Sequence, residues 1–531
     1  MAEDRIDTDV VIVGGGPVGL SLSLMLSLQG VDHLLVERHP STTFHPKARN
    51  LNTRTMEIVR GWGVDDAMDD IALGPGWCSS IAYCKDLASP EIGRMTTGGF
   101  VGVGDDLSPV VPHLSSQDVY EPVWRKRAEE LAPGSLRFGV SLDAFVDQGD
   151  HVEVSVRPVD GPVEVIRTRY LVGCDGWNSP VRQGLGLQLE GRAGMARFVN
   201  VYFRADLSDL VAHRPAVLFF TTEPRGVFQP LDGGDRWLCQ ITHLEEGDPL
   251  EAYPTDRCVE WVRQAAGDPE REVEILSVGT WTMNATVADH YRVGRCLLAG
   301  DAVHQLPPTG GFGANTGIQD AHNLAWKLGA VLRGEAGDML LDTYETERRP
   351  IAAYNAARSL DNSRMVGRIT EMALAGGDAA AEVGRTTRYG NFTGMELGFH
   401  YDEGAVVPDG TPAPAPQDPV IDYVPTCRPG HRLPHAWIDD GGGKSTLDLV
   451  GRGLVAMAVD PVMLEGVVNL GHQAGVALAE CPLSTAVAAA VGLEEGQVLV
   501  VRPDGHVGWR GANPTPAEVV GAAARILGVD R

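Results

Sequence analysis

Three glycines in the pattern Gly14-x-Gly16-x-x-Gly19 follow a short β-branched run, and they constrain the fold more than any other feature of the chain. Glycines at this spacing let the backbone turn sharply, let a pyrophosphate approach the main chain, and let a helix pack close to a strand. The flanking residues predict a buried parallel strand over 8–13, a helix over 17–29 that begins at Pro17, and a second strand over 33–37. The chain is therefore predicted to open with a βαβ nucleotide-binding unit.

Residues 10–31 carry no charge, and their length alone would suit a transmembrane segment or a signal peptide. The glycines and Pro17 interrupt this stretch, which favours a strand, a tight turn and a helix over one continuous apolar helix. We therefore expect neither secretion nor a membrane partner. The eight cysteines are scattered without a C-x-x-C pair, so no disulfide scaffold or metal site is indicated and a cytoplasmic location is expected.

Glu37 ends the second predicted strand, where a carboxylate can accept hydrogen bonds from both ribose hydroxyls of an adenosine. The same negative charge disfavours a 2′-phosphate at this position. The nucleotide bound here is therefore expected to be FAD or NAD(H) rather than NADP(H). The adjacent Arg38 is included among the candidate cofactor contacts.

The bulk composition is that of an ordinary globular protein, with 43% hydrophobic and 22% charged residues. A length of 531 residues is too great for one compact core and predicts roughly three domains. The formal net charge of −27 repels polyphosphate backbones, so nucleic acid is not expected as a partner.

Two further stretches each contain a glycine turn next to an aspartate. The first is D-G-x-x-S-x-x-R, from Asp175 to Arg182, and the second is GDAVHQLPPTGGFGANTGIQDAHNLAWKL, from Gly300 to Leu328. Asp301, at the tip of a strand, can bind a ribityl hydroxyl, and the loop from Pro307 to Gly313 allows main-chain groups to lie against an isoalloxazine edge. A helix beginning near Ala314 would point its positive end at an electron-rich reduced flavin. The candidate contacts in this stretch are Gly300, Asp301, Pro307, Gly311, Gly313, Ala314 and Asn315.

Together, the glycine turn with Glu37 and these two stretches resemble the flavoprotein monooxygenases of the para-hydroxybenzoate hydroxylase type. The likeness is greatest to the larger phenol hydroxylases and the polyketide-tailoring members. The resemblance implies that Asp175 and Arg182 serve both FAD and the approach of the reductant, and that Gln117 lies near the FAD phosphates. Relatives more often carry an arginine at the position of Lys47, so either Lys47 or Arg49 is expected to contact the pyrophosphate.

The fold expected from the residues and the resemblance is α/β. It has a Rossmann-like FAD-binding domain, an inserted and mainly antiparallel β-sheet substrate domain, and a C-terminal thioredoxin-like α/β module without disulfide chemistry. We expect the FAD-binding domain over 1–185 and 291–400, the substrate domain over 186–290 and the C-terminal module over 401–531. Further helices are predicted over 53–61, 118–131, 314–333 and 338–360, and strands over 136–146, 150–157, 163–173 and 296–299.

The resemblance implies an FAD-dependent monooxygenase that hydroxylates a phenol-like ring, with NADPH or NADH as the electron donor and a flavin C4a-hydroperoxide as the oxygen donor. Such a site must exclude water and favour an electron-rich ring. No residue is assigned as the catalytic base. His304 lies in the flavin loop, and a role in shaping that loop is favoured over titration during catalysis. The substrate, O2 and a second copy of the chain in a homodimer or higher homo-oligomer are the expected partners.

Several alternatives stay open. The substrate could be a simple or chlorinated phenol, a hydroxypyridine or an aromatic polyketide, and a natural-product aromatic is favoured. A Baeyer–Villiger oxygenase on the same scaffold and a flavin-binding protein without oxygenase activity are the rival functions. The glycines before Lys444 resemble a P-loop, but Ile438 occupies the position of that motif's first glycine, so a P-loop is rejected.

Overall fold

The first domain has at its centre the βαβ unit predicted from the glycine turn. The computed structural model describes residues 6–242, 244, 252–439 and 441–529. In it, β1 spans Thr8–Val13, α1 spans Pro17–Gln29 and β2 spans His33–Glu37, as the sequence predicts. β1 lies between β2 and β10 (Glu164–Gly173), and both pairings are parallel. The full strand order is β16-β17-β10-β1-β2-β7, in which β16 spans Arg292–Val293, β17 spans Cys296–Leu298 and β7 spans Leu136–Phe138. β9 (Val152–Pro158) pairs with β10, and β8 (Val140–Asp147) pairs with β9.

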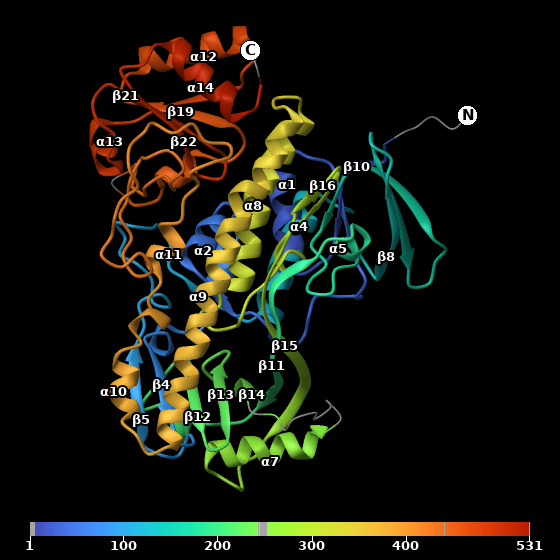
Figure 1. Ribbon diagram of the computed structural model, residues 1–531, viewed down its shortest axis with the longest axis vertical. Helices are drawn as coiled ribbons and strands as arrows, with labels where there is room; N and C mark the ends of the chain where they lie inside the picture. The colour runs from blue at the N-terminus through green and yellow to red at the C-terminus, as the bar shows by residue number, and fades with distance from the viewer. Residues whose placement is uncertain (1–5, 243, 245–251, 440, 530–531) are drawn as a thin grey trace.

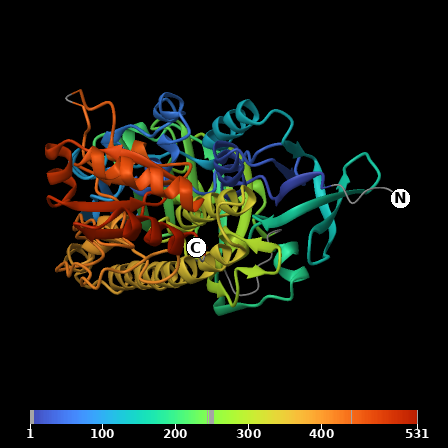
Figure 2. The same ribbon diagram turned by 90° about the horizontal axis from the view of Figure 1, so that it is seen from above.

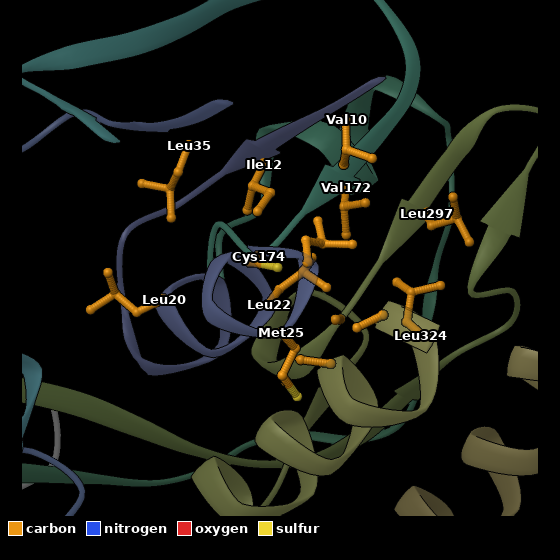
Figure 3. Close-up of a cluster of buried hydrophobic side chains, with 14 of the residues drawn as sticks. Val10, Ile12, Leu20, Leu22, Met25, Leu35, Val172, Cys174, Leu297 and Leu324 are labelled. Carbon is orange, nitrogen blue, oxygen red and sulfur yellow. The ribbon is translucent and has the colours of Figure 1, made fainter. Parts of the chain in front are cut away.

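The core of this domain forms because β1 and β10 are buried on both faces. Their runs of valine, isoleucine and leucine pack against the apolar side chains of α1, as Figure 3 shows for Ile12, Leu22 and Val172. α8 covers the same side, and Leu324 on α8 belongs to the same cluster. The remaining elements of this domain are β3 (Asn50–Leu51), α2 (Thr53–Arg60), α3 (Asp65–Asp69), β6 (His113–Leu114), α4 (Gln117–Leu131) and α5 (Pro180–Gly184).

A second, mainly antiparallel sheet forms the end of the molecule opposite the C-terminal module (Figure 1). Its order is β18-β15-β11-β14-β13-β12-β4-β5, and α7 (Thr255–Ala266) packs against it. Most of its strands come from the predicted insertion, but β4 and β5 come from residues before 186, and β4 pairs with β12 in parallel. Its elements are β4 (Ser80–Cys84), β5 (Glu91–Thr96), β11 (Leu189–Arg204), α6 (Ser208–Val211), β12 (Leu218–Thr222), β13 (Arg225–Pro230), β14 (Arg236–Ile241), β15 (Glu274–Ala288) and β18 (His304–Gln305).

Two long helices connect the sheets with the C-terminal part of the chain. α8 spans Phe312–Leu332 and begins two residues before the predicted Ala314. The second predicted helix is longer than expected: a short 3-10 turn at Asp338–Leu341 leads into α9, which continues from Asp342 to Leu374. In Figure 1, α9 runs from the region of the first domain down to the second sheet. The short helices α10 (Ala379–Gly384) and α11 (Thr393–Leu397) follow.

The C-terminal module has the topology of a thioredoxin fold, as the sequence predicts. Its sheet has the order β20-β19-β21-β22, with β19 parallel to β20 and antiparallel to β21. The module stacks on one side of the long helices, as Figure 2 shows from above. Its elements are β19 (Leu454–Ala458), α12 (Pro461–Ala474), β20 (Leu478–Pro482), α13 (Thr485–Val491), β21 (Gln497–Val501), β22 (Val507–Ala512) and α14 (Pro516–Ile526).

None of the helices in the described part of the chain combines the length and the apolar character that a membrane crossing requires. The uncharged residues 10–31 form a strand, a turn and a helix instead.

Candidate active site

The glycine turn packs closely on one side and leaves space on the other. A Cβ atom at Gly14 would lie 2.3 Å from the carbonyl oxygen of Cys174, and one at Gly19 would lie 1.9 Å from the carbonyl oxygen of Gly14. A Cβ atom at Gly16 would meet nothing within 4 Å. Gly14 and Gly19 are therefore required for packing between β1, α1 and the second turn. Gly16 faces open space at the N-terminus of α1, where a phosphate is favoured.

Glu37 lies over this turn from the end of β2. Its carboxylate accepts hydrogen bonds from the backbone N–H of Gly15 at 2.7 Å and of His39 at 2.8 Å. The side chain thus fixes the glycine turn and remains at the carboxyl edge of the sheet, the position expected of a ribose ligand. Arg38, the next residue, has an exposed side chain.

The second turn adjoins the first. A Cβ atom at Gly14 would lie 3.0 Å from the Cα of Asp175. One carboxylate oxygen of Asp175 accepts from the N–H of Val181 at 3.0 Å, whereas the other, Oδ1, is buried and has no hydrogen-bond partner. Burial raises the pKa of Asp175. A buried acceptor without a partner is costly unless a ligand supplies a donor.

Arg182 connects the second turn to the third. Its guanidinium donates to the carbonyl oxygen of Ala302 at 3.0 Å and to that of Trp177 at 3.3 Å. Ser179 caps α5 by accepting from the N–H of Arg182. The described structure therefore gives Arg182 a bracing role between the D-G-x-x-S-x-x-R stretch and the Gly300–Ala302 turn.

Asp301 combines an accessible side chain with surroundings rich in protein atoms. It is exposed to solvent, yet desolvation by neighbouring groups raises its pKa, against the opposing charges of His304 and Lys47. The carboxylate is therefore accessible although many protein atoms lie close to it. Gly300, just before it, has a φ of +66°, and Val18 on α1 fills the space where a Cβ atom at Gly300 would lie. α1 therefore packs directly beneath the Asp301 turn.

Lys47 and Arg49, which the sequence leaves as alternatives, point to different places. Lys47 is exposed and acts electrostatically on Asp301 and Glu121. Arg49 is buried, and its guanidinium donates to acceptors at the substrate sheet. Gln117 lies beside Lys47, where its Oε1 accepts from the N–H of Ala48 at 3.3 Å. Lys47 is therefore the better candidate for a phosphate contact.

The flavin loop ends at the N-terminus of α8. Gly311 has a φ of +69° and caps the helix, and a Cβ atom at Gly313 would meet nothing within 4 Å. Asn315 fixes the first turn, because its Nδ2 donates to the carbonyl oxygens of Gly311 at 2.7 Å and Asn50 at 2.8 Å. Pro307 is buried and Ala314 half-buried. The open side of the loop thus faces the same edge of the sheet as Asp301.

His304 is buried and contributes to the structure of the loop. Its Nε2 lies 2.7 Å from Oδ2 of Asp320 on α8, and Oδ1 of Asp320 accepts from Nε of Arg348 on α9 at 2.8 Å. The sequence interpretation did not include Asp320 or Arg348. A signal for the former was available, because Asp320, Asn323 and Lys327 recur at a spacing of three or four residues along α8.

The C-terminal module is bonded to the flavin domain by buried charges. Arg502 on the loop after β21 donates to the Glu347 carboxylate on α9 at 2.9 and 2.8 Å. Lys327 on α8 donates to Glu347 at 2.9 Å, and Arg54 on α2 donates to the carbonyl oxygen of Asp504 at 2.7 Å. The module therefore contacts α2, α8 and α9, the helices whose other ends surround the candidate cofactor site.

These residues fit a flavin adenine dinucleotide. Gly16 and Gly313 leave open space, Asp175 Oδ1 has no protein donor, and Asp301 and Lys47 remain accessible at the same edge. A candidate ribose ligand, a candidate phosphate ligand and two helix N-termini thus lie at the carboxyl edge of the sheet.

Comparisons with known proteins agree with this arrangement. The family described as "FAD binding domain" matches residues 7–359, and the family described as "Aromatic-ring hydroxylase, C-terminal" matches residues 426–529. The tetracenomycin B2 monooxygenase-dioxygenase of Streptomyces olivaceus is 36% identical over 99% of both chains. The 4-methyl-5-nitrocatechol 5-monooxygenase of a Burkholderia species is 35% identical over 95% of this chain and 94% of its own. The crystal structure of the flavin-dependent monooxygenase PieE with FAD and substrate is 33% identical, covers 98% of this chain and 100% of its own, and has a TM-score of 0.90.

The chain belongs to the FAD-binding family of aromatic-ring hydroxylases. It is an FAD-dependent aromatic monooxygenase whose electron donor is NADPH or NADH.

Proposed function

We propose that this monooxygenase hydroxylates a phenolic ring of a polycyclic natural product. The observation that carries the proposal is a cluster of aromatic side chains between the flavin loop and the substrate sheet. Phe312 begins α8 and packs against Phe392 with ring centroids 5.2 Å apart, and Phe220 on β12 stacks on Tyr83 of β4 at 4.9 Å. All four side chains belong to one buried hydrophobic cluster, whose aromatic faces suit contact with a flat, extended ring system. The likeness to the tetracenomycin enzyme supports a natural-product substrate, whereas the nitrocatechol relative keeps simple phenols as the second choice.

We further propose how the chain holds its cofactor. Glu37 binds the adenosine ribose, Lys47 and the N-terminus of α1 bind the pyrophosphate, and Asp301 binds a ribityl hydroxyl. The main chain of 307–313 and the first turn of α8 would hold the isoalloxazine ring. When bound, FAD would accept electrons from NAD(P)H and activate O2. The chain's own task is to exclude water, orient the ring and hold its phenol oxygen.

A panel of aromatics tests the proposed substrate class. The purified FAD-loaded protein is mixed with NADPH or NADH and with phenol, a chlorophenol, a hydroxypyridine and a hydroxyanthraquinone. We expect the hydroxyanthraquinone to stimulate NAD(P)H oxidation most strongly. NMR of the product should show a new phenol, and a ring lactone in its place would assign Baeyer–Villiger chemistry. A protein that consumes no O2 with any of the four would contradict the proposal.

We also propose that the chain acts as a homodimer. The resemblance implies this assembly, and the paired strands β8 and β9 lie at the edge of the first domain, where Figure 1 labels β8. Light scattering on the purified protein measures the assembly directly. A mass equal to one chain across micromolar concentrations would exclude the dimer.

A further inference from the structure

Arg49 is a buried cation whose hydrogen bonds go only to neutral acceptors. Its Nε donates to Oε1 of Gln229 at 2.8 Å, and its Nη1 donates to the carbonyl oxygen of Pro230 at 3.1 Å. Its Nη2 donates to the carbonyl oxygen of Val217. Among the residues that the structure describes, no carboxylate forms an ion pair with this guanidinium. Burying a charge in such surroundings costs free energy, because neutral hydrogen-bond acceptors only partly replace the water that solvated the guanidinium.

The other buried arginines each have a carboxylate nearby that offsets the free-energy cost of burying the charge. Arg182 is coupled electrostatically to the nearby Asp175. The rest contact a carboxylate directly: Arg54 and Arg432 pair with Glu57, Arg348 with Asp320, and Arg502 with Glu347 and Asp504. Arg49 departs from this pattern, so its missing counter-charge requires an explanation.

The nearest titratable groups cannot supply the negative charge at neutral pH. Burial lowers the pKa of Arg49 to about 10, so the guanidinium stays protonated there. The groups that act on it are the Cys78 thiol and the Tyr389 hydroxyl. Burial raises the pKa of both groups above their ordinary values. Both groups are therefore neutral at neutral pH, where Arg49 is charged.

The position of Arg49 connects the flavin loop to the substrate sheet. The next residue, Asn50, donates to the carbonyl oxygen of Gly310 at 3.3 Å and accepts from Asn315 at the start of α8. From there the Arg49 side chain reaches the strand ends of β12 and β13, through Val217, Gln229 and Pro230.

An aromatic cluster adjoins this position. The Tyr389 hydroxyl acts electrostatically on Arg49, and Val217, whose carbonyl oxygen accepts from Arg49, belongs to the same buried cluster as Tyr389 and Phe220. Tyr389 packs near Phe220 with ring centroids 6.3 Å apart, and Phe220 stacks on Tyr83, whose buried hydroxyl has no hydrogen-bond partner. A cation and two phenol hydroxyls thus belong to an otherwise apolar aromatic region. That composition suits a flat aromatic ligand that carries one negative oxygen.

We propose that Arg49 binds the ionised phenol oxygen of the substrate and thereby favours the phenolate. The O–H bond of the phenol breaks, its proton passes to solvent, and the electron pair stays on the oxygen beside the guanidinium. The ring becomes more electron-rich, which favours attack on an electrophilic oxygen. This inference rests on the proposed phenolic substrate, and it assigns Arg49 to the substrate rather than to the FAD pyrophosphate.

The probe for this role is 4-nitrophenol, whose phenolate is coloured, with its methyl ether 4-nitroanisole as the neutral counterpart. The FAD-loaded protein is titrated with each compound across pH. We expect the pKa of bound 4-nitrophenol to lie below that of the free compound. Arg49→Gln should raise the pKa of the bound probe by one unit or more, a tenfold or larger loss of phenolate preference, and should leave 4-nitroanisole binding unchanged.

Two variants serve as controls. Arg192→Gln removes one positive charge from an exposed position on β11, and it should leave the pKa of the bound probe unchanged. Arg49→Lys keeps the buried charge and should retain a lowered pKa even if Arg49→Gln does not fold. Flavin absorbance of each variant reports separately whether FAD is still bound.

Three results would overturn the proposal. The wild-type protein could bind 4-nitrophenol no better than 4-nitroanisole, or Arg49→Gln could leave the pKa of the bound probe as it is in the wild type. The variant could also change the reduction potential of the flavin without changing probe ionisation, which would assign the cation to the cofactor. None of these binding measurements needs turnover. A failure to hydroxylate the aromatic panel can therefore be distinguished from a failure of Arg49 to favour the phenolate.

Discussion

Arg502 of the C-terminal module donates two hydrogen bonds to the carboxylate of Glu347 on α9, at 2.9 and 2.8 Å, and both side chains are fully buried. Glu347 also accepts from Lys327 on α8 at 2.9 Å. The module is thus attached by charges that water cannot reach. Because α8 begins at the flavin loop, the module braces a helix that reaches the candidate active site. We therefore interpret the module as a structural part of the enzyme.

Removing the charge of Glu347 should be strongly destabilising. Glu347→Gln leaves Arg502 and Lys327 as buried cations without their shared carboxylate, and breaking such a group costs about 3–5 kcal/mol. Urea denaturation measures the free energy of unfolding. The control is Asp143→Asn, which breaks the exposed pair with Arg157 and should cost less than about 1 kcal/mol. Equal losses of unfolding free energy in the two variants would show that the buried ion pair stabilises the protein no more than the exposed one.

Substitution of two glycines of the first turn by alanine should have different effects, on folding at Gly19 and on FAD affinity at Gly16. Gly19→Ala places a Cβ atom 1.9 Å from a backbone oxygen, so the turn must rearrange and the folded protein should be lost. Gly16→Ala has open space in the protein itself, so apoprotein stability should change by less than about 0.5 kcal/mol. FAD affinity of Gly16→Ala should nevertheless fall by about tenfold or more, because the methyl group enters the proposed pyrophosphate position. Fluorescence of released flavin gives the affinity, and full retention of FAD by Gly16→Ala would contradict the assignment of this space.

Asp301→Ala should lose FAD while keeping its fold. The carboxylate is partly desolvated without an ion pair among the described residues, so its removal should not destabilise the apoprotein. A lost hydrogen bond to a charged group costs about 1.5–3 kcal/mol, which weakens FAD binding by roughly 10- to 100-fold. Circular dichroism checks the fold and visible absorbance checks the flavin. Yellow, fully active Asp301→Ala protein would contradict the assigned role.

Glu37→Ala should also weaken FAD binding.

The sequence predicts the parts of the fold that local patterns determine. β1, α1 and β2 match their predicted bounds because glycine spacing and β-branched runs act within thirty residues. β4 was not anticipated; it pairs with the nearby β5 and, on its other side, with β12, which lies more than a hundred residues later. Pairings of that kind are decided by packing rather than by propensity.

The candidate site shows the same division. Gly16, Glu37 and Asp301 could be singled out because each belongs to a motif, and the structure brings all three to one edge of the sheet. The choice between Lys47 and Arg49 could not be made from sequence, since it depends on acceptors from Val217 to Pro230. Glu347 and Arg502 are 155 residues apart, and no local pattern joins them.

Glu396 should make the stability of the wild-type protein fall as pH rises. Burial raises its pKa from 4.5 to about 8, against opposing hydrogen bonds from Thr53. The folded state therefore holds a proton that the unfolded state releases, so stability is full below about pH 4.5 and declines as pH rises toward 8. The decline from this group has a limiting slope of about 1.4 kcal/mol per pH unit.

Glu396→Gln keeps the shape and cannot ionise, so it isolates this contribution. We expect the variant to gain stability relative to the wild type as pH increases from 5 to 8, because the pKa of Glu396 in the folded wild-type protein is about 8. Urea denaturation at several pH values measures the difference in unfolding free energy. Because other titrating groups are common to both proteins, they cancel in that difference. A difference that stays constant across this range would mean that Glu396 has the same pKa in the folded and unfolded states.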